Sequence, residues 1–74
     1  MGYSVPRTQR VRLDVFDALG RRVATLLDRT VSAGAGEAVW NGTDHTGHPV
    51  ASGTYFCRMV SEDGDRVIRM VLLK

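Results

Sequence analysis

Two runs of β-forming residues near the end of the chain are separated by a short turn sequence. The runs cover residues 54–61 and 66–73, and the segment between them contains Asp63-Gly64. Asp-Gly in a two-residue loop is the strongest local signal for a β-hairpin. If Asp63 and Gly64 form that loop, Glu62 lies opposite Asp65, and the residue numbers of every opposed pair sum to 127.

This register predicts one wholly apolar face and one mixed face for the hairpin. The apolar face would pair Tyr55 with Leu72, Cys57 with Met70 and Met59 with Ile68, and the other face would pair Phe56 with Val71, Val60 with Val67 and Arg58 with Arg69. Opposed arginines repel one another unless water or acidic groups surround them. We therefore expect the mixed face to be exposed, with an apolar patch at Phe56, Val71 and Leu73.

The rest of the chain also alternates with a period of two, interrupted by turn signals. Val11, Leu13 and Val15 predict the core side of a strand over residues 9–16, and residues 17–20 predict a turn that ends at a left-handed Gly20. Residues 22–29 fit a returning strand or a short helix, and we favour the strand. Residues 32–36 are expected to be a flexible connection, and residues 37–40 a strand with Trp40 in the core. Residues 41–53 are expected to be a loop, with at most a short strand at Pro49-Val50.

A further strand near residues 2–5 brings the total to six or seven. The expected fold is all-β, an immunoglobulin-like antiparallel β-sandwich forming one domain over residues 1–74. At 74 residues, each ordered residue costs roughly 1.5 kcal/mol of conformational entropy, so nearly all apolar side chains must be buried. A deep catalytic cleft is therefore not expected.

The charge pattern does not indicate a nucleic-acid partner. The net charge is +2, and the chain has neither a run of like charges nor a transmembrane or signal-peptide pattern at its start. A group of arginines could form a basic edge for an anionic ligand, but acidic residues are interleaved with it, so we favour solvated surface. These arginines are Arg7, Arg10, Arg12, Arg21 and Arg22.

No set of residues indicates catalysis, a cofactor or a metal. His45 and His48 lie beside Asp44 in a Gly-rich loop, which supplies too few rigid ligands for a metal. The acidic residues around Asp63 are explained by the turn, and Cys57 is expected on the core face as a small hydrophobe. We expect a non-enzymatic domain.

Three motifs in order resemble the immunoglobulin-like C-terminal domains that act as type IX secretion sorting signals. They are residues 11–26, with Val11-Arg12-Leu13-Asp14-Val15-Phe16-Asp17; Trp40-Asn41-Gly42 with Gly47 and Val50-Ala51-Ser52-Gly53-Thr54-Tyr55-Phe56; and the end Arg69-Met70-Val71-Leu72-Leu73-Lys74. Similar sandwiches occur in the flagellar hook-capping protein and its relatives. The family often begins with Asn-Pro-Phe, so the chain is expected to lack the family's first strand and part of its linker. The family also often has Thr before its final basic pair, where this chain has Val67-Ile68.

The resemblance implies a cargo tail at the surface of a Gram-negative bacterium. Its implied partners are an upstream cargo domain of the same polypeptide, the outer-membrane secretion machinery and a cell-surface processing enzyme. Because a folded signal must be read from its surface, we expect a recognition surface around the last strand. Its residues would be Phe56, Arg58, Arg69, Val71 and Lys74.

Two alternatives remain open at this point. The same fold could be a protein- or carbohydrate-binding module, or a spacer of a secreted multidomain protein. Exposed strand edges could also pair two copies into a homodimer.

Overall fold

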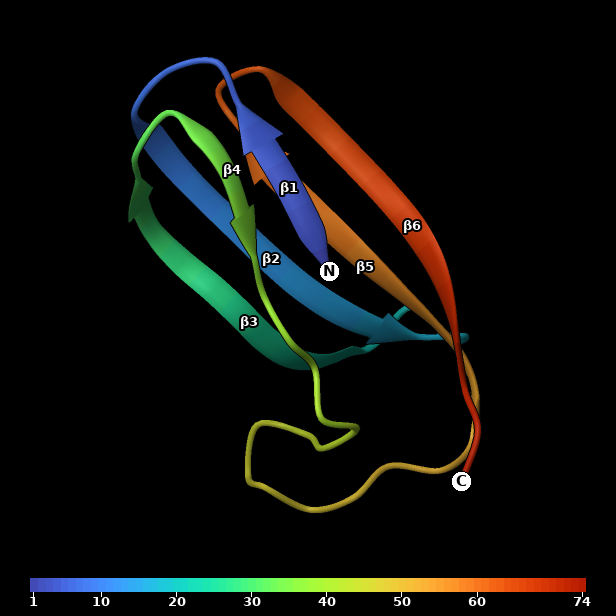
Figure 1. Cartoon of the computed structure of the whole chain (residues 1–74). Helices are drawn as coiled ribbons and strands as arrows, with labels where there is room; N and C mark the ends of the chain where they lie inside the picture. The colour runs from blue at the N-terminus through green and yellow to red at the C-terminus, as the bar shows by residue number, and fades with distance from the viewer.

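The computed structural model describes all 74 residues and contains six strands and no α-helix (Figure 1). No segment is therefore a helix that could cross a membrane. The all-β prediction and the strand number are confirmed. The strands are β1 (Gly2–Val5), β2 (Gln9–Asp17), β3 (Arg22–Val31), β4 (Gly34–Glu37), β5 (Gly53–Ser61) and β6 (Gly64–Leu72).

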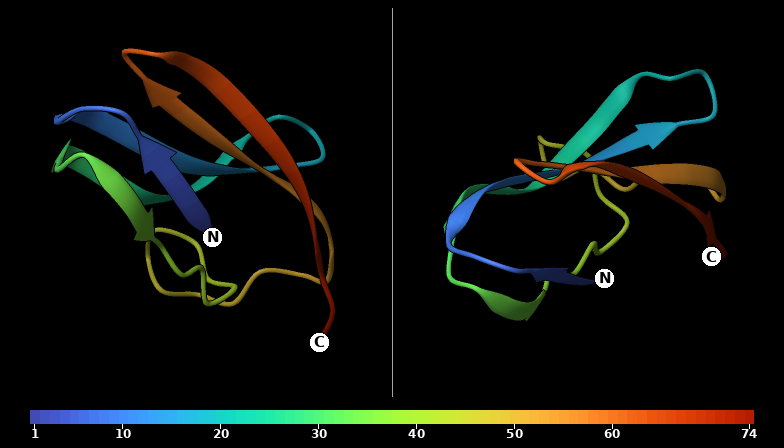
Figure 2. Two further views of the ribbon diagram at one scale, coloured as in Figure 1. Left: turned by 45° about the horizontal axis from the view of Figure 1, so that its top comes forward. Right: turned by 90° about the horizontal axis from the view of Figure 1, so that it is seen from above.

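The strands form two antiparallel sheets that lie face to face (Figure 2). The large sheet has the order β3-β2-β5-β6, and the small sheet consists of β1 and β4. Viewed from above, β1 and β4 form a separate layer beside the large sheet. This two-layer arrangement agrees with the predicted immunoglobulin-like β-sandwich.

The core lies between the two sheets and is centred on β2. Val11, Leu13 and Val15 are at most 1% exposed, which confirms the predicted aliphatic face of this strand. From the neighbouring β5, Tyr55 and Cys57 are also buried. Burial of these side chains in the centre of the large sheet fixes which face of the β5–β6 hairpin points outward, because side chains alternate along a strand.

The predicted turn after β2 forms around Asp17. Gly20 has φ of +82°, and its amide donates to the Asp17 carbonyl oxygen at 3.0 Å. The amides of Leu19 and Arg21 both donate to Asp17 Oδ1 at 2.9 Å. The chain then returns as β3, so the strand interpretation of residues 22–29 is confirmed.

The fourth strand lies earlier in the sequence than predicted. Residues 37–40 were expected to be the strand, but β4 is Gly34–Glu37 and Trp40 lies outside any strand. The glycine-rich segment forms this strand because its backbone pairs with β1, and backbone pairing needs no β-forming side chains. Pro49 makes only an isolated bridge with Thr43, at the site of the expected short strand.

The predicted register of the final hairpin is wrong by two residues. Glu62 and Asp63 form the loop, and Ser61 pairs with Gly64. An Asp63-Gly64 loop of the common primed type would need positive φ at Asp63, whereas only glycines have positive φ here. Gly64, with φ of +117°, instead follows the turn and pairs with Ser61 as the first residue of β6.

A shift of two residues leaves every side chain on its predicted face but changes its partner. Tyr55 lies opposite Met70, Cys57 opposite Ile68 and Met59 opposite Arg66. The inner face of the hairpin is therefore apolar except at Arg66 and at Ser61, the last residue of β5.

Candidate recognition surface

Four of the five predicted recognition residues lie on the outer face of the β5–β6 hairpin. Phe56 and Arg58 come from β5, and Arg69 and Val71 come from β6. Val71 is 63% exposed and Phe56 is half-buried. Period-two alternation places them together because their inward neighbours Tyr55, Cys57 and Met70 face the core.

The predicted pairs across this face are not those of the structure. Arg69 lies opposite Phe56, and Val71 lies opposite Thr54. Arg58 lies opposite Val67 and forms an ion pair with Asp65, so the expected pair of opposed arginines does not exist. Arg69 makes no ion pair in the structure, which leaves a free positive charge beside an aromatic ring on the outer face.

Lys74, the fifth predicted residue, lies after the end of β6. Its backbone amide donates to Ser52 Oγ at 3.0 Å, which ties the end of the chain to the segment before β5. Its side chain is exposed and lies outside the strand pairing that aligns the other four residues. The structure therefore brings four of the predicted residues onto one face and places Lys74 beyond its end.

Two side chains extend this surface that the sequence reasoning did not assign to it. Phe16 of β2 lies directly opposite Phe56, and Val67 of β6 is 61% exposed. The sequence alternation already places Val67 on this face, although the predicted recognition residues do not include it. The position of Phe16 could not be predicted from the sequence, because it depends on the long-range pairing of β2 with β5.

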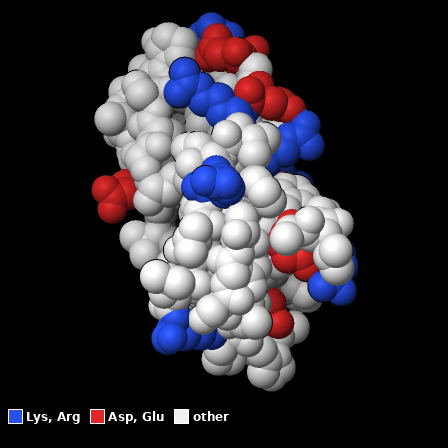
Figure 3. Space-filling model, turned by 90° about the vertical axis from the view of Figure 1, so that its right-hand side faces the viewer, with Lys and Arg blue, Asp and Glu red and all other residues white.

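The side of the molecule that carries the β6 edge is uncharged over much of its middle (Figure 3). Charged atoms lie at its centre, right-hand margin and base, and they are densest at the upper end, where the β5–β6 turn lies. There Arg7 approaches Asp63 at 3.2 Å and Glu62 at 4.0 Å. The charges at the turn compensate one another, and the exposed Arg58 is paired with Asp65. The apolar side chains and Arg69 are therefore what the outer face leaves unpaired.

The arginines considered as a basic edge are mostly paired with carboxylates. Arg10 approaches Asp28 at 2.8 Å, and Arg21 approaches Asp17 at 2.8 Å. Arg12 donates to Asp14 at 2.7 Å, and this hydrogen bond raises the pKa of Arg12. These pairs lower the positive potential that an anionic polymer would need.

The histidine loop is organised by Asp44. Its Oδ1 accepts from the Thr46 hydroxyl at 2.6 Å and from the amides of Thr46 and His48 at 2.9 and 3.1 Å. The hydroxyl contact is the largest cause that lowers the pKa of Asp44. No group of three or more His, Cys, Asp or Glu side chains is placed to hold a metal ion.

Comparison with known proteins identifies the domain family. No curated protein and no solved structure gives a significant match to the chain. The family model described as the FlgD Ig-like domain matches residues 5–65, which span β2 to β5 in full. With its two antiparallel sheets and central β2, the chain belongs to the FlgD Ig-like domain family.

Proposed function

We propose that this domain is a non-catalytic sorting signal that directs an attached cargo protein through the type IX secretion system to the cell surface. Its partners would be the outer-membrane secretion machinery, a cell-surface processing enzyme and a cargo domain on the same polypeptide. The proposed location is the surface of a Gram-negative bacterium or the medium around it. The sequence resemblance in three ordered motifs supports this role.

The observation that carries the proposal is the outer face of the β5–β6 hairpin. Phe56 and Val71 present apolar surface there, and Arg69 adds a charge that forms no ion pair with a carboxylate of the chain. A receptor that reads a folded signal needs such a rigid surface, with apolar contact for affinity and a charge for orientation.

The test is export of a fluorescent reporter fused in front of the domain, in a bacterium that has this secretion system. Deletion of residues 69–74 should abolish export of the reporter. Because that deletion also removes part of β6, the surface substitution R69E combined with V71K tests recognition without truncation. The matched control is R29E, an exposed arginine of β3 that makes no ion pair. Unchanged export of the R69E/V71K fusion, with the fold retained, would contradict the proposed surface.

A second candidate is a module that binds protein or carbohydrate, or serves as a spacer. The observation in its favour is the half-buried Phe16–Phe56 pair on the outer face, since exposed aromatic rings can stack on a partner. Trp40 and Tyr55 do not contribute to such a surface, because they pack against each other at the core. Strong retention of the domain on immobilised polysaccharides, lost in F56A, would favour this candidate.

The free edge of β6 is also where we propose that two copies could pair as a homodimer. This strand is nine residues long, and its outer side carries no further strand. Long exposed edges favour pairing with another strand. Sedimentation over a range of concentrations would detect such a dimer, and V67K should weaken it.

A further inference from the structure

The small sheet leaves part of the large sheet uncovered. It has two strands, whereas the large sheet has four, and β6 extends past the free edge of β1 (Figure 1). Ile68 lies on the inner side of β6, opposite the buried Cys57, yet it is 48% exposed. An apolar strip of the large sheet therefore lies open beside β1.

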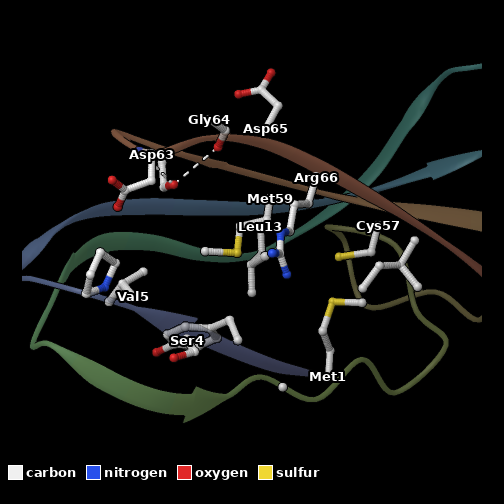
Figure 4. Close-up of a pocket in the computed structure, with 15 residues that line it drawn as sticks. Met1, Ser4, Val5, Leu13, Cys57, Met59, Asp63, Gly64, Asp65 and Arg66 are labelled. Carbon is white, nitrogen blue, oxygen red and sulfur yellow. Dashed lines mark hydrogen bonds between the residues drawn. The ribbon is translucent and has the colours of Figure 1, made fainter.

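A cavity of about 380 Å³ occupies this place, between β1 and the β5–β6 hairpin (Figure 4). Leu13, Cys57, Met59 and Ile68 line its apolar side, and β1 forms the opposite wall. A water molecule in the liquid takes about 30 Å³. The cavity is more than ten times that volume, so it has room for a few apolar side chains.

The backbone of β1 can pair with a further strand on this side. Met1 and Ala38 exchange two hydrogen bonds, of 2.6 Å from the Met1 amine and 2.8 Å from the Ala38 amide. Such mutual pairs recur at every second residue of an antiparallel ladder. The backbone amides and carbonyls of Tyr3 and Val5 therefore also point toward β4. The amides and carbonyls of Gly2 and Ser4 consequently point toward the free edge, where no strand of the chain lies.

The charge left free at the cavity is positive. Arg66 lies opposite Met59 on the inner face, and its side chain reaches into the cavity in Figure 4. Arg66 makes no ion pair, whereas Asp63 and Asp65 at the same end are paired with Arg7 and Arg58. A segment seated here would therefore be favoured by an acidic side chain near Arg66.

We infer that this cavity accepts an extended segment of a partner polypeptide, which adds to β1 as a third strand of the small sheet. Backbone pairing with Gly2 and Ser4 would supply hydrogen bonds, and inward side chains at alternate positions would fill the cavity. Two of these side chains would be apolar and the third acidic, facing Arg66. Of the edge strands that a second copy could offer, β3 and β6 carry more arginine than acid, and β1 carries no charged side chain. The remaining edge strand β4 has Glu37, but its other residues are Gly and Ala, too small to fill the cavity. A separate acidic partner is therefore favoured over self-pairing.

The test uses the 74-residue chain and a capped peptide, Thr-Glu-Thr-Val-Thr-Val-Thr. In an antiparallel arrangement its Glu and Val side chains face inward, and its third and fifth residues pair with Ser4 and Gly2. Titration followed by NMR should give saturable shifts at Gly2, Ser4, Met59 and Ile68, and should slow hydrogen exchange of the Ser4 amide. N-methylation of the third and fifth peptide amides should weaken binding about tenfold or more. N-methylation of the Glu and Val amides, which face away from β1, should be tolerated.

Two variants of the chain test the edge and the charge separately. S4P removes the proposed donor of β1 at an exposed position and should abolish binding while the thermal melt stays cooperative; S4T is its control. R66E should weaken binding of the Glu peptide about tenfold and should strengthen binding of a peptide with Lys in place of Glu. R69E, on the outer face, should change the affinity for neither peptide.

Several results would overturn the inference. They are equal binding of both N-methylated peptides, equal effects of R66E and R69E, exchange protection confined to the outer edge of β6, and absence of binding at millimolar peptide. A homodimer that S4P dissociates would assign the cavity to a second copy instead.

Discussion

The phenol ring of Tyr3 lies over Gly36, its partner across the small sheet. A Cβ atom at Gly36 would overlap the ring, with Tyr3 Cε1 only 2.9 Å away and the far end of the ring closer still. Gly36 does not have positive φ, so its role is to leave space rather than to permit an unusual backbone. Tyr3 in turn packs against the core between the sheets.

We predict that G36A destabilises the domain by about 1–2 kcal/mol, because the Tyr3 ring must leave its position. Chemical denaturation of the two proteins measures the difference. Y3L should remove most of the overlap, so the cost of G36A should be smaller in the Y3L background. If G36A costs the same with either residue at position 3, the ring is not the cause.

Tyr55 links the core to the loop before β5, so substitutions of Tyr55 should lower the free energy of unfolding. Its hydroxyl donates to the Ala51 carbonyl oxygen at 2.6 Å, and its ring meets Trp40 edge to face with centroids 5.0 Å apart. Y55F should lower the free energy of unfolding by about 1 kcal/mol through the lost hydrogen bond. Denaturation followed by fluorescence of Trp40, the only tryptophan, measures this loss. Y55L should cost more than Y55F, because it also removes the aromatic contact; equal costs would show that the ring contact contributes little.

The turn at Asp17 should make stability depend on pH. Backbone hydrogen bonds, first that from Arg21, lower the pKa of Asp17 below its usual value of 3.8. A carboxylate with a lowered folded-state pKa stabilises the fold above its unfolded pKa, and this contribution is lost as pH falls through the folded-state pKa. Thermal melts of the wild type and D17N should therefore differ at pH 7 and converge in acid. D17N keeps an oxygen acceptor for the turn, so a difference that persists unchanged in acid would assign the effect to geometry rather than charge.

The thiol of Cys57 should react slowly in the folded protein. The residue is 1% exposed, and burial raises the pKa of its thiol. Since the thiolate is the reactive form, modification by a disulfide reagent at pH 8 should be at least roughly tenfold slower than in denaturant. The unfolded chain ionises first as pH rises, so this group makes stability fall above the usual thiol pKa. C57A should lose that part of the pH dependence, and rapid labelling of the native wild type would contradict the burial.

The sequence alone determined which side chains face the core. The alternation of Val11, Leu13 and Val15 and of Tyr55, Cys57 and Met59 needs only the period of two that an extended chain imposes. The Gly20 turn was equally local, since Asp17 and the left-handed glycine act within a few residues. The same parity placed Phe56, Arg58, Arg69 and Val71 on one outer face, and it survived an error of two in the register because such a shift preserves parity.

Tertiary structure decided what depends on contacts between distant segments. The strand at Gly34–Glu37 exists because β1 pairs with it and Tyr3 covers Gly36, and no local preference of glycine predicts a strand. The position of the final turn is held by Gln9, which donates to Asp63 Oδ2 at 2.7 Å and accepts from the Glu62 amide at 2.9 Å, more than fifty residues away. The open edge of β1 and the cavity beside Arg66 likewise arise only when two sheets of unequal width meet. Local patterns set the direction of each side chain, whereas the partner it meets depends on the whole chain having folded.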